Sequence, residues 1–356
     1  MIRVLVVEDS PVACELLIHI LNSDAGIQVI GTAANGREAV EFVQHDKPDL
    51  ITMDIHMPEM DGFEASRLIM ETHPVPIVVV TSSCNIKELE TSFCAIEVGA
   101  LTVLQKPQGI GHPDHEKTAR NLIATVKLMA EIKVVRRWFR TVASPLQHER
   151  RSMQEGGMAF HLALVKAVAI GASTGGPPVI EKILAELPKD FPAPVLIVQH
   201  MAEGFTHGFA EWLGQTSKLP VHVPSHGSMT CPSHVYVAPN GVQMGMDAAG
   251  RILCTGDEPE NGLRPSASYL FRSIAKVFGK NAIGVLLTGM GKDGAVELKL
   301  MKEKGAVTIA QNMESSAVYG MPGEAVKIGA AKYVLPADKI AAVLTSIAMS
   351  KIKREE

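Results

Sequence analysis

Short apolar runs alternate with helix-length segments over the first hundred residues. Each run is continuously apolar and does not alternate with polar residues, which is typical of parallel strands that helices cover on both faces. The pattern therefore predicts an α/β domain built on an open, mostly parallel sheet. The runs are 4–7, 50–53, 77–80 and 101–104, and the clearest helix-length segments are 11–21 and 36–44.

The same alternation returns after Lys166 and continues to the end of the chain. It predicts a second doubly wound, mostly parallel α/β sheet. Ligands of such a sheet bind beyond the carboxyl ends of its strands, so chemistry is expected at that edge. The apolar runs of this second series are 167–170, 195–198, 235–238, 283–287 and 307–310.

Between the two series the chain is polar and basic. Gly, Pro and His are frequent in 108–115, and a basic stretch of helical length follows from Lys117 to Arg140. Residues 108–160 hold nine basic and five acidic residues, a net charge of +4. We predict a linker that carries one basic helix. The expected organisation is a domain of 1–107, a linker of 108–160 and a domain of 161–350.

Composition and charge agree with two globular domains. The chain has 356 residues, of which 46% are hydrophobic, so it can bury two cores and is not a disordered chain. Its net charge of −4 is unevenly spread, because residues 1–107 hold 16 acidic and 6 basic residues, a net −10. Residues 161–356 hold 19 basic and 17 acidic residues, an excess too small for a nucleic-acid-binding surface.

Targeting signals and cysteine spacing bear on the location of the protein. No apolar run reaches the roughly 18–20 residues of a membrane span, and Glu8 and Asp9 interrupt the apolar start where a signal peptide would continue. The five cysteines form no Cys-x-x-Cys pair, so neither a zinc knuckle nor a disulfide framework is expected. We expect a cytoplasmic protein that does not insert into the membrane and does not bind nucleic acid.

Polar residues follow four of the apolar runs in the first domain. Because the carboxyl ends of parallel strands meet at one edge of a sheet, we expect these side chains to converge. Three converging carboxylates repel one another unless a hard cation such as Mg²⁺ lies among them. Single strand-end carboxylates are usually solvated loop residues, but five polar groups at four consecutive ends favour a site. They are Glu8, Asp9, Asp54, Thr81 and Lys106.

Such a site could transfer phosphate. Asp54 could attack a phosphoryl group, while the metal and Lys106 neutralise the phosphoryl oxygens and Thr81 donates a hydroxyl hydrogen bond.

A glycine-rich segment follows the first apolar run of the second domain, with the order Gly171-Ala172-Ser173-Thr174-Gly175-Gly176. A dinucleotide fingerprint would need glycine in place of Ser173, and a phosphate loop would need lysine in place of Pro177. The segment fits Gly-x-Ser-x-Gly, a tight strand-to-helix turn that exposes a nucleophilic serine hydroxyl. Taken alone, the segment fits an ordinary glycine-rich turn equally well.

A serine nucleophile needs a base, and the base needs an orienting carboxylate. Of the 13 histidines, His200 is the one that directly follows a long apolar run of this domain. Asp293 lies in a glycine-rich loop after another run, although Asp-Gly turns are common. The three groups should converge at one sheet edge. Their chain order, Ser-His-Asp, differs from the Ser-Asp-His order of α/β-hydrolases.

The first domain resembles the receiver domain of two-component response regulators over essentially all of 1–107. The resemblance rests on 6–10 (Val-Val-Glu-Asp-Ser), 53–62 (Met-Asp-Ile-His-Met-Pro-Glu-Met-Asp-Gly), 81–82 (Thr-Ser) and 106–107 (Lys-Pro).

The receiver resemblance implies a flavodoxin-like fold, Asp54 as the phosphorylated residue and Thr81 and Lys106 as switch residues. It also implies a sensor histidine kinase as phosphodonor and a cis peptide bond before Pro107. The implied Mg²⁺ ligands are Glu8, Asp9, Asp54 and the backbone carbonyl of His56. One departure is Thr102-Val103, where receivers usually carry an aromatic switch residue near the second position.

The second domain resembles the catalytic domain of the CheB family of chemotaxis methylesterases, on the segments 171–177, 198–206, 264–266, 287–295 and 315–322. The resemblance implies Ser173 as nucleophile, His200 as base and Asp293 as its orienting carboxylate, with Thr174 and Met290 lining the site and no cofactor for the esterase reaction. Two departures are Gln243, in a segment where the family often has Pro-Gly-Gly and a following His, and Ser268, where an acidic residue is common.

Together these resemblances imply a phosphorylation-regulated serine hydrolase. It would demethylate glutamate methyl esters, and deamidate glutamines, on cytoplasmic helices of chemoreceptors, releasing methanol or ammonia. The unphosphorylated receiver would cover the esterase cleft until Asp54 is phosphorylated. Two alternatives stay open from the sequence. One is a receiver fused to a non-enzymatic receptor-binding module, and the other is an esterase of a chemosensory system that does not control motility.

Overall fold

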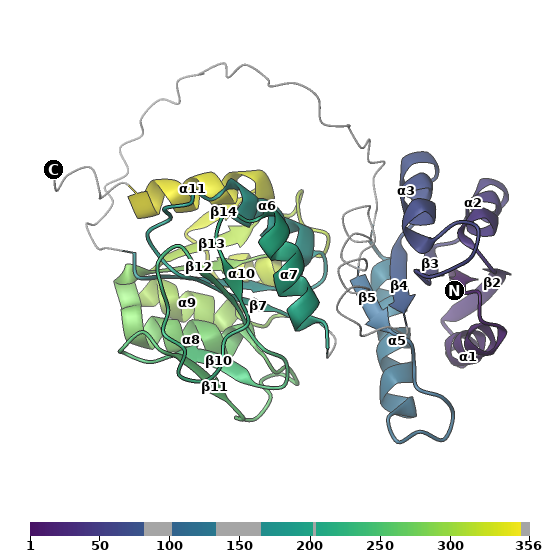
Figure 1. Cartoon of the computed structure of the whole chain (residues 1–356), viewed down its shortest axis with the longest axis horizontal. Helices are drawn as coiled ribbons and strands as arrows, with labels where there is room; N and C mark the ends of the chain where they lie inside the picture. Colours follow the sequence, from purple (N-terminus) through teal and green to yellow (C-terminus); the bar gives the residue numbers. More distant parts are fainter. Residues whose placement is uncertain (82–101, 133–164, 202–203, 350–356) are drawn as a thin grey trace, which may run out of the picture.

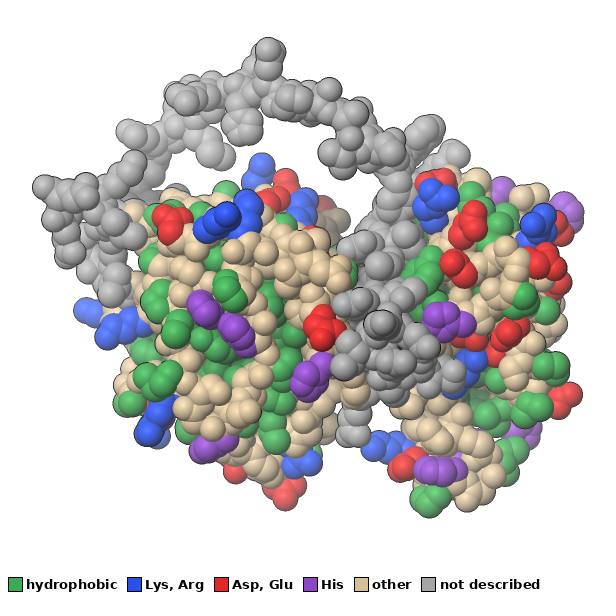
Figure 2. Space-filling model, viewed as in Figure 1, with side chains coloured by type: hydrophobic (Ala, Val, Ile, Leu, Met, Phe, Trp, Pro, Cys, Tyr) green, Lys and Arg blue, Asp and Glu red, His purple; other side chains and the backbone are tan. Residues whose placement is uncertain are grey.

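The structure is a computed structural model that describes residues 1–81, 102–132, 165–201 and 204–349. Two layered α/β units are visible in Figure 1, one formed by the described residues up to 132 and the other by those from 165 onward. We call them the first unit and the second unit. On the face drawn in Figure 2, Asp and Glu side chains are more frequent on the first unit, at the right.

The first unit is built on a five-stranded sheet with the order β2-β1-β3-β4-β5, and every strand pair is parallel. This is the flavodoxin-like order, as the receiver resemblance implied. The inner strands are buried along nearly their whole length, which explains their continuously apolar sequences. The strands are β1 (Ile2–Val7), β2 (Ile27–Ala33), β3 (Leu50–Met53), β4 (Ile77–Thr81) and β5 (Thr102–Gln105).

Helices cover both faces of this sheet. α2 (Gly36–His45) and α3 (Gly62–Thr72) pack on one face, and α1 (Pro11–Asn22) and α5 (His115–Ala130) on the other. Three of these helices begin where the sequence supplies a capping side chain that accepts a first-turn amide hydrogen bond, which stabilises a helix end by about 1 kcal/mol. The caps are Ser10, Asn35 and Asp61.

The helix that the sequence assigned to the linker packs on the first unit instead. The first unit therefore extends beyond the predicted boundary at 107 and includes α5. Leu122, Val126 and Met129 of α5 are buried against α1 and the sheet. They lie four and three residues apart, which forms one apolar helix face, and the polar and charged residues elsewhere on the helix obscured that face in the sequence. The helix ends at Ala130. The rest of the predicted linker, 133–160, lies outside the described residues.

The second unit is built on a seven-stranded sheet with the order β14-β13-β12-β6-β7-β9-β8, again with parallel pairs throughout. The predicted second doubly wound sheet is confirmed. Its strands are β6 (Ala167–Ala172), β7 (Val195–Gln199), β8 (Val221–His222), β9 (Val235–Val237), β12 (Ala282–Leu286), β13 (Val307–Gln311) and β14 (Tyr333–Leu335).

Two apolar cores sandwich this sheet. The first core lies beneath α6 (Gly176–Glu186), α7 (Thr206–Thr216) and α11 (Ala337–Met349). The second lies beneath α8, α9 and α10 and includes an antiparallel hairpin of β10 and β11, which the sequence patterns did not predict. Among the described residues, no helix has the length and apolar character to span a membrane. The remaining elements are α8 (Ala267–Phe278), η1 (Gly279–Asn281), α9 (Ala295–Glu303), α10 (Met321–Lys327), β10 (Gln243–Met246) and β11 (Ile252–Thr255).

The strand order creates a switch point at β6. The chain leaves β6 toward β7 on one side and later returns to pair β12 on the other side. Loops at the carboxyl ends of β12, β6 and β7 therefore diverge from three adjacent strands and leave a crevice, which is the usual ligand site of such sheets.

Candidate functional site

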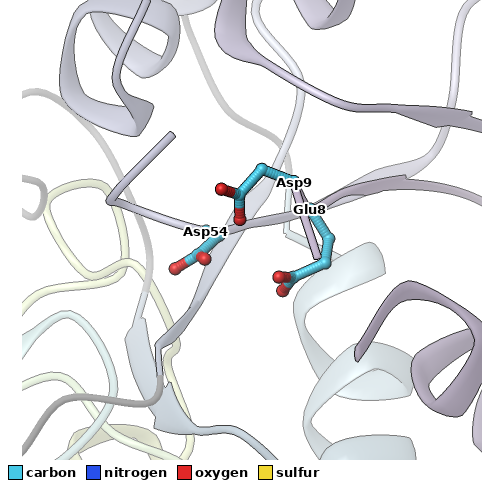
Figure 3. Close-up of side chains that lie close together, drawn as sticks. All are labelled: Glu8, Asp9 and Asp54. Carbon is cyan, nitrogen blue, oxygen red and sulfur yellow. The ribbon is translucent and has the colours of Figure 1, made fainter. Parts of the chain in front are cut away.

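Three carboxylates converge at the carboxyl edge of the first sheet. Glu8 and Asp9 follow β1, Asp54 follows the adjacent β3, and one oxygen of each lies within 4.8 Å of the others. Figure 3 shows the three side chains gathered around a common space. Glu8 and Asp54 are buried, while Asp9 is exposed. The predicted convergence of these residues is thus present in the structure.

Lys106 reaches this cluster from the end of β5. Its Nζ lies 2.7 Å from both Glu8 Oε2 and Asp54 Oδ2. Burial raises the pKa of Glu8, the Asp54 charge raises it further, and the bond to Lys106 offsets only part of this. Burial lowers the pKa of the Lys106 ammonium, but its hydrogen bonds to Asp54 and Glu8 outweigh burial and raise it. One ammonium therefore serves two buried carboxylates.

The backbone around Asp54 is tightly enclosed. Asp54 Oδ1 accepts a hydrogen bond from the Ile55 amide at 2.7 Å. A Cβ atom at Gly62, the first residue of α3, would lie 2.0 Å from the Asp54 carbonyl oxygen, so only glycine fits there. Thr81 ends β4 next to β3 and is buried.

The resemblance implied a cis peptide bond before Pro107. Among the described residues, the one cis peptide bond precedes Pro265, so that prediction is wrong.

The donor set at this edge fits a hard divalent cation. It offers three carboxylates whose oxygens already converge, which is the ligand type that Mg²⁺ prefers. Two of the carboxylates are buried, and a single lysine leaves the cluster with net negative charge. A cation placed among them would relieve their repulsion.

In the second unit, Ser173, His200 and Asp293 follow three adjacent strands: β6, β7 and β12. Ser173 lies in the turn into α6, where its backbone N–H donates to Thr288 O at 3.0 Å and its carbonyl accepts from the Gly176 amide at 2.9 Å. Gly175 has a φ of +74°, which favours glycine at this position of the turn. The sequence Gly-x-Ser-x-Gly thus forms a strand-to-helix turn.

His200 is held by the buried carboxylate of Asp293. His200 Nε2 lies 2.9 Å from Asp293 Oδ2, and because an ionised carboxylate only accepts, Nε2 carries the proton. The imidazole Nδ1 is then the nitrogen left to accept a proton. This orientation is opposite to that of the chymotrypsin triad, in which the carboxylate binds Nδ1.

Ser173 and His200 line one small pocket of about 50 Å³. No hydrogen bond joins their side chains in the part of the chain that the structure describes. Thr174 also lines this pocket, whereas Met290 is not among the lining residues and is 55% exposed. The other lining residues are Thr102 and Val103 of the first unit and Gly175, Pro177, Gln199, Met201 and Phe205 of the second.

Asp293 accepts hydrogen bonds from four donors although it is only 3% exposed. Besides His200, these are the Ser266 hydroxyl at 2.7 Å and the backbone amides of Ala267 and Ser268 at 2.6 and 3.1 Å. Burial raises the pKa of Asp293, but the bond to His200, the His200 charge and the two serines outweigh it and lower the pKa to about 2. The carboxylate therefore stays ionised, and its place at the amino end of α8 favours the same charge.

Gln199, the last residue of β7, ties the nucleophile to the base. Its Nε2 donates to the carbonyl oxygens of Ser173 at 2.8 Å and of His200 at 2.9 Å. Its Oε1 is buried without a hydrogen-bond partner among the described residues. The sequence reasoning missed this role. The available signal was a glutamine at the end of an otherwise apolar, fully buried strand.

The two family departures lie near Asp293. Gln243 is buried and its Oε1 accepts the backbone N–H of Ser266 at 2.9 Å. The Ser268 amide donates to Asp293, and its hydroxyl accepts from the Gly294 amide at 2.9 Å. Ser268 therefore contacts the Asp293 carboxylate and Gln243 supports it through Ser266. The sequence did not indicate either role.

Comparison with known proteins agrees with this geometry. The family model of the CheB methylesterase matches residues 168–344, and that of the response regulator receiver domain matches residues 4–112. A protein-glutamate methylesterase/protein-glutamine glutaminase of Nitrosospira multiformis is 57% identical over 348 residues, 98% of this chain and 97% of the relative. The chain belongs to the CheB methylesterase family.

Further relatives cover the same extent. A protein of the same description from Syntrophus aciditrophicus is 53% identical over 350 residues, 98% of this chain and 99% of the relative. The crystal structure of the Thermotoga maritima CheB methylesterase catalytic domain is 39% identical, with a TM-score of 0.50, and covers 51% of this chain and 98% of that one. CheB relatives thus match both units and the segment between them.

The low pKa of Asp293 predicts a pH dependence of stability. Its pKa falls from 3.8 to about 2 on folding, so the ionised carboxylate stabilises the second unit above pH ~4, and this contribution, about 2 kcal/mol, is lost as the pH falls toward 2. The excess stability of the wild type over Asp293→Asn should therefore shrink by that amount between pH 5 and 2. Urea unfolding followed by Trp212 fluorescence, with Trp138→Phe in both proteins, measures it. A pH-independent difference would contradict the assignment.

Proposed function

We propose that this CheB-family chain hydrolyses methyl esters of glutamate side chains, and deamidates glutamines, on cytoplasmic helices of chemoreceptors. The observation that carries the proposal is the pairing of His200 with the buried Asp293 carboxylate beside Ser173, in a pocket at the switch point of the second sheet. A binding module has no need of an ionised, buried carboxylate that orients a histidine toward a serine.

The reaction is an acyl transfer to Ser173. His200 Nδ1 takes the proton of the serine hydroxyl as Oγ attacks the ester carbonyl, and the imidazolium then returns that proton to the leaving methoxide, which departs as methanol. An amide substrate would release ammonia in the same way. Water activated by His200 next attacks the acyl-enzyme, frees the glutamate and restores the serine. Asp293 stays ionised and stabilises the imidazolium throughout.

Backbone amides hold the oxyanion in this proposal. The amide of Thr174 follows the nucleophile directly, which is the usual donor position in a Gly-x-Ser-x-Gly turn. The second donor comes from the loop at Met290. Support for this loop is the close approach of Gly289, at which a Cβ atom would lie 2.6 Å from Ser173 Cβ.

The first unit serves as the switch. Asp54 accepts a phosphoryl group from a sensor histidine kinase, with Lys106 and Thr81 contacting the phosphoryl oxygens. The Mg²⁺ ligands in this proposal are Glu8, Asp9, Asp54 and the carbonyl of His56. The ion, when bound, neutralises charge on the phosphoryl oxygens. The crowded carboxylates and their single ammonium support this assignment.

β5 connects the two sites. Thr102 and Val103 line the same pocket as Ser173 and His200, and Lys106 follows them in the chain. Val103 packs against the cores of both units. In the unphosphorylated protein the first unit therefore obstructs the esterase pocket, and a phosphoryl group that draws on Lys106 would displace β5 from it. Val103 couples the sites by contact at the position where receivers usually rotate an aromatic ring.

The interface between the units is open enough to separate. A groove of about 540 Å³ lies between α5 and the loop at 262–265, lined by polar groups such as Gln108, Thr118 and Asn121. Polar, incompletely packed interfaces favour relative domain motion. We take the first unit through α5 as the receiver and the chain from about 161 onward as the esterase.

Removal of the nucleophile tests the proposed chemistry. Ser173→Ala should lower methanol release from a methylated receptor fragment by about 10³-fold or more, because the variant lacks the nucleophile that forms the acyl-enzyme. A fluorophosphonate probe should label the wild type at Ser173 and leave the variant unlabelled. Ser225→Ala, at an exposed serine, is the matched control and should behave as the wild type. Substantial turnover by Ser173→Ala would rule out the acyl-serine route.

Removal of the receiver tests the switch. A chain that begins at His161 should demethylate receptors without a phosphodonor, about 5- to 150-fold faster than the unphosphorylated full chain, the range expected for allosteric coupling. Acetyl phosphate should activate the full chain and leave Asp54→Asn at its basal rate. Equal activity of the shortened and full chains would show that the receiver does not obstruct the pocket.

A further inference from the structure

Ser266 caps α8 and contacts the carboxylate of Asp293 directly. Its hydroxyl donates to Asp293 Oδ1 at 2.7 Å and accepts the Ser268 amide at 3.1 Å. Ser266 is fully buried and does not line the pocket that contains Ser173. It therefore does not touch a substrate there, and its only route to the reaction is through Asp293.

Gln243 holds Ser266 in place. Its Oε1 accepts the Ser266 amide at 2.9 Å, and its Nε2 donates to the carbonyls of Glu258 and Leu263 at 3.2 and 3.1 Å. Both ends of the amide group are thus used, and the group joins β10 to the segment that leads into α8. A continuous chain of hydrogen bonds runs from Gln243 through Ser266 and Asp293 to His200.

We propose that Ser266 is a positioning residue of the esterase, whose hydroxyl fixes the rotation and the basicity of the Asp293 carboxylate, with Gln243 fixing Ser266 in turn. The inference rests on the proposed function, because it extends the Ser173–His200–Asp293 assignment to two residues that act through Asp293.

The physical reason lies in how the two carboxylate oxygens are divided. Oδ2 is shared by His200 Nε2 and the Ala267 amide, and Oδ1 by the Ser266 hydroxyl and the Ser268 amide. Without the hydroxyl, Oδ1 keeps one long bond, so the carboxylate can rotate and the imidazole loses its orientation. Negative charge on Asp293 is also less neutralised, which stabilises the imidazolium form of His200.

These effects separate a positioning role from a structural one. Misorientation lowers kcat, while KM stays unchanged because Ser266 is remote from the substrate pocket. A more stable imidazolium moves the acid limb of the pH–rate profile to higher pH, because the base must be neutral to accept the serine proton. Simple loss of helix stability lowers the folded fraction, and with it the apparent kcat, but leaves the acid limb in place.

Other charged groups face His200 and are the same in every variant. Asp293 contacts it directly, and Arg264, Asp114 and Lys117 line the groove on its other side. A difference between the wild-type and variant profiles therefore reports the change at Ser266.

The test uses the full chain activated by acetyl phosphate, with methanol release from a methylated receptor fragment measured from pH 5 to 9. Ser266→Ala should lower kcat roughly 10- to 100-fold with KM within about twofold, and should move the acid limb to higher pH. Ser266→Thr keeps the hydroxyl and should restore most of the activity. Ser273→Ala is the matched control, because that hydroxyl lies on the same helix but bonds to Met246.

Wild-type kcat and acid limb in Ser266→Ala would overturn the inference, as would an equal loss in Ser273→Ala. If Ser266→Ala does not fold, Ser266→Cys provides the test, because a thiol nearly keeps the side-chain volume but is a weak hydrogen-bond donor. This variant should move the acid limb of the pH–rate profile in the same direction. Failure of the proposed function is distinguishable, since turnover by Ser173→Ala would then persist. An inactive Ser173→Ala together with a wild-type-like Ser266→Ala would refute this inference alone.

Discussion

The buried carboxylate of Asp293 is the constraint on which the second unit depends. An ionised carboxylate inside a protein is tolerated only where hydrogen bonds and opposite charge replace its water. Here the amino end of α8 supplies two amides, Ser266 supplies a hydroxyl and His200 supplies the remaining donor. Placement of α8, of its cap and of the loop after β12 follows from that requirement. The same bonds leave His200 with one free ring nitrogen at the edge of the pocket.

In the first unit, which is also a parallel α/β sheet, the buried carboxylates have too few donors and too little positive charge around them. Its buried carboxylates also follow adjacent parallel strands, but a single lysine serves both Glu8 and Asp54. The cluster therefore keeps an excess of negative charge that a cation can relieve. The net charge of the cluster changes when Asp54 receives a phosphoryl group. One unit thus holds a fixed, satisfied carboxylate suited to catalysis. The other holds a crowded cluster suited to switching, and β5 lies between them.

Much of this arrangement could be predicted from the sequence. Continuously apolar runs located the buried strands, and residues directly after those runs identified Ser173, His200 and the acidic cluster, because parallel strands bring their carboxyl ends to one edge. β2 was missed because it mixes exposed and buried residues at the sheet edge. The helix α5 was misassigned because its residues before Leu122 are mostly polar or charged, which hides the apolar face that follows.

The support of Asp293 could not be predicted. Gln243 and Ser266 lie 50 and 27 residues before Asp293 in the chain, in a hairpin and at a helix cap that no apolar pattern announces. The role of Gln199 could not be predicted because the sequence does not show to which side of the sheet a glutamine at a strand end points. In each case the function comes from a hydrogen bond between distant segments, which only the folded chain reveals.

The central claim is that ionised Asp293 holds the Nε2 proton of His200 and leaves Nδ1 free for Ser173. Nitrogen-15 NMR of the histidine side chains, with His200 assigned by comparison with His200→Gln, reports the protonation of each ring nitrogen in the full chain. In the neutral imidazole of His200 we expect a proton on Nε2 and an unprotonated Nδ1. A proton on Nδ1 with a bare Nε2 would contradict it.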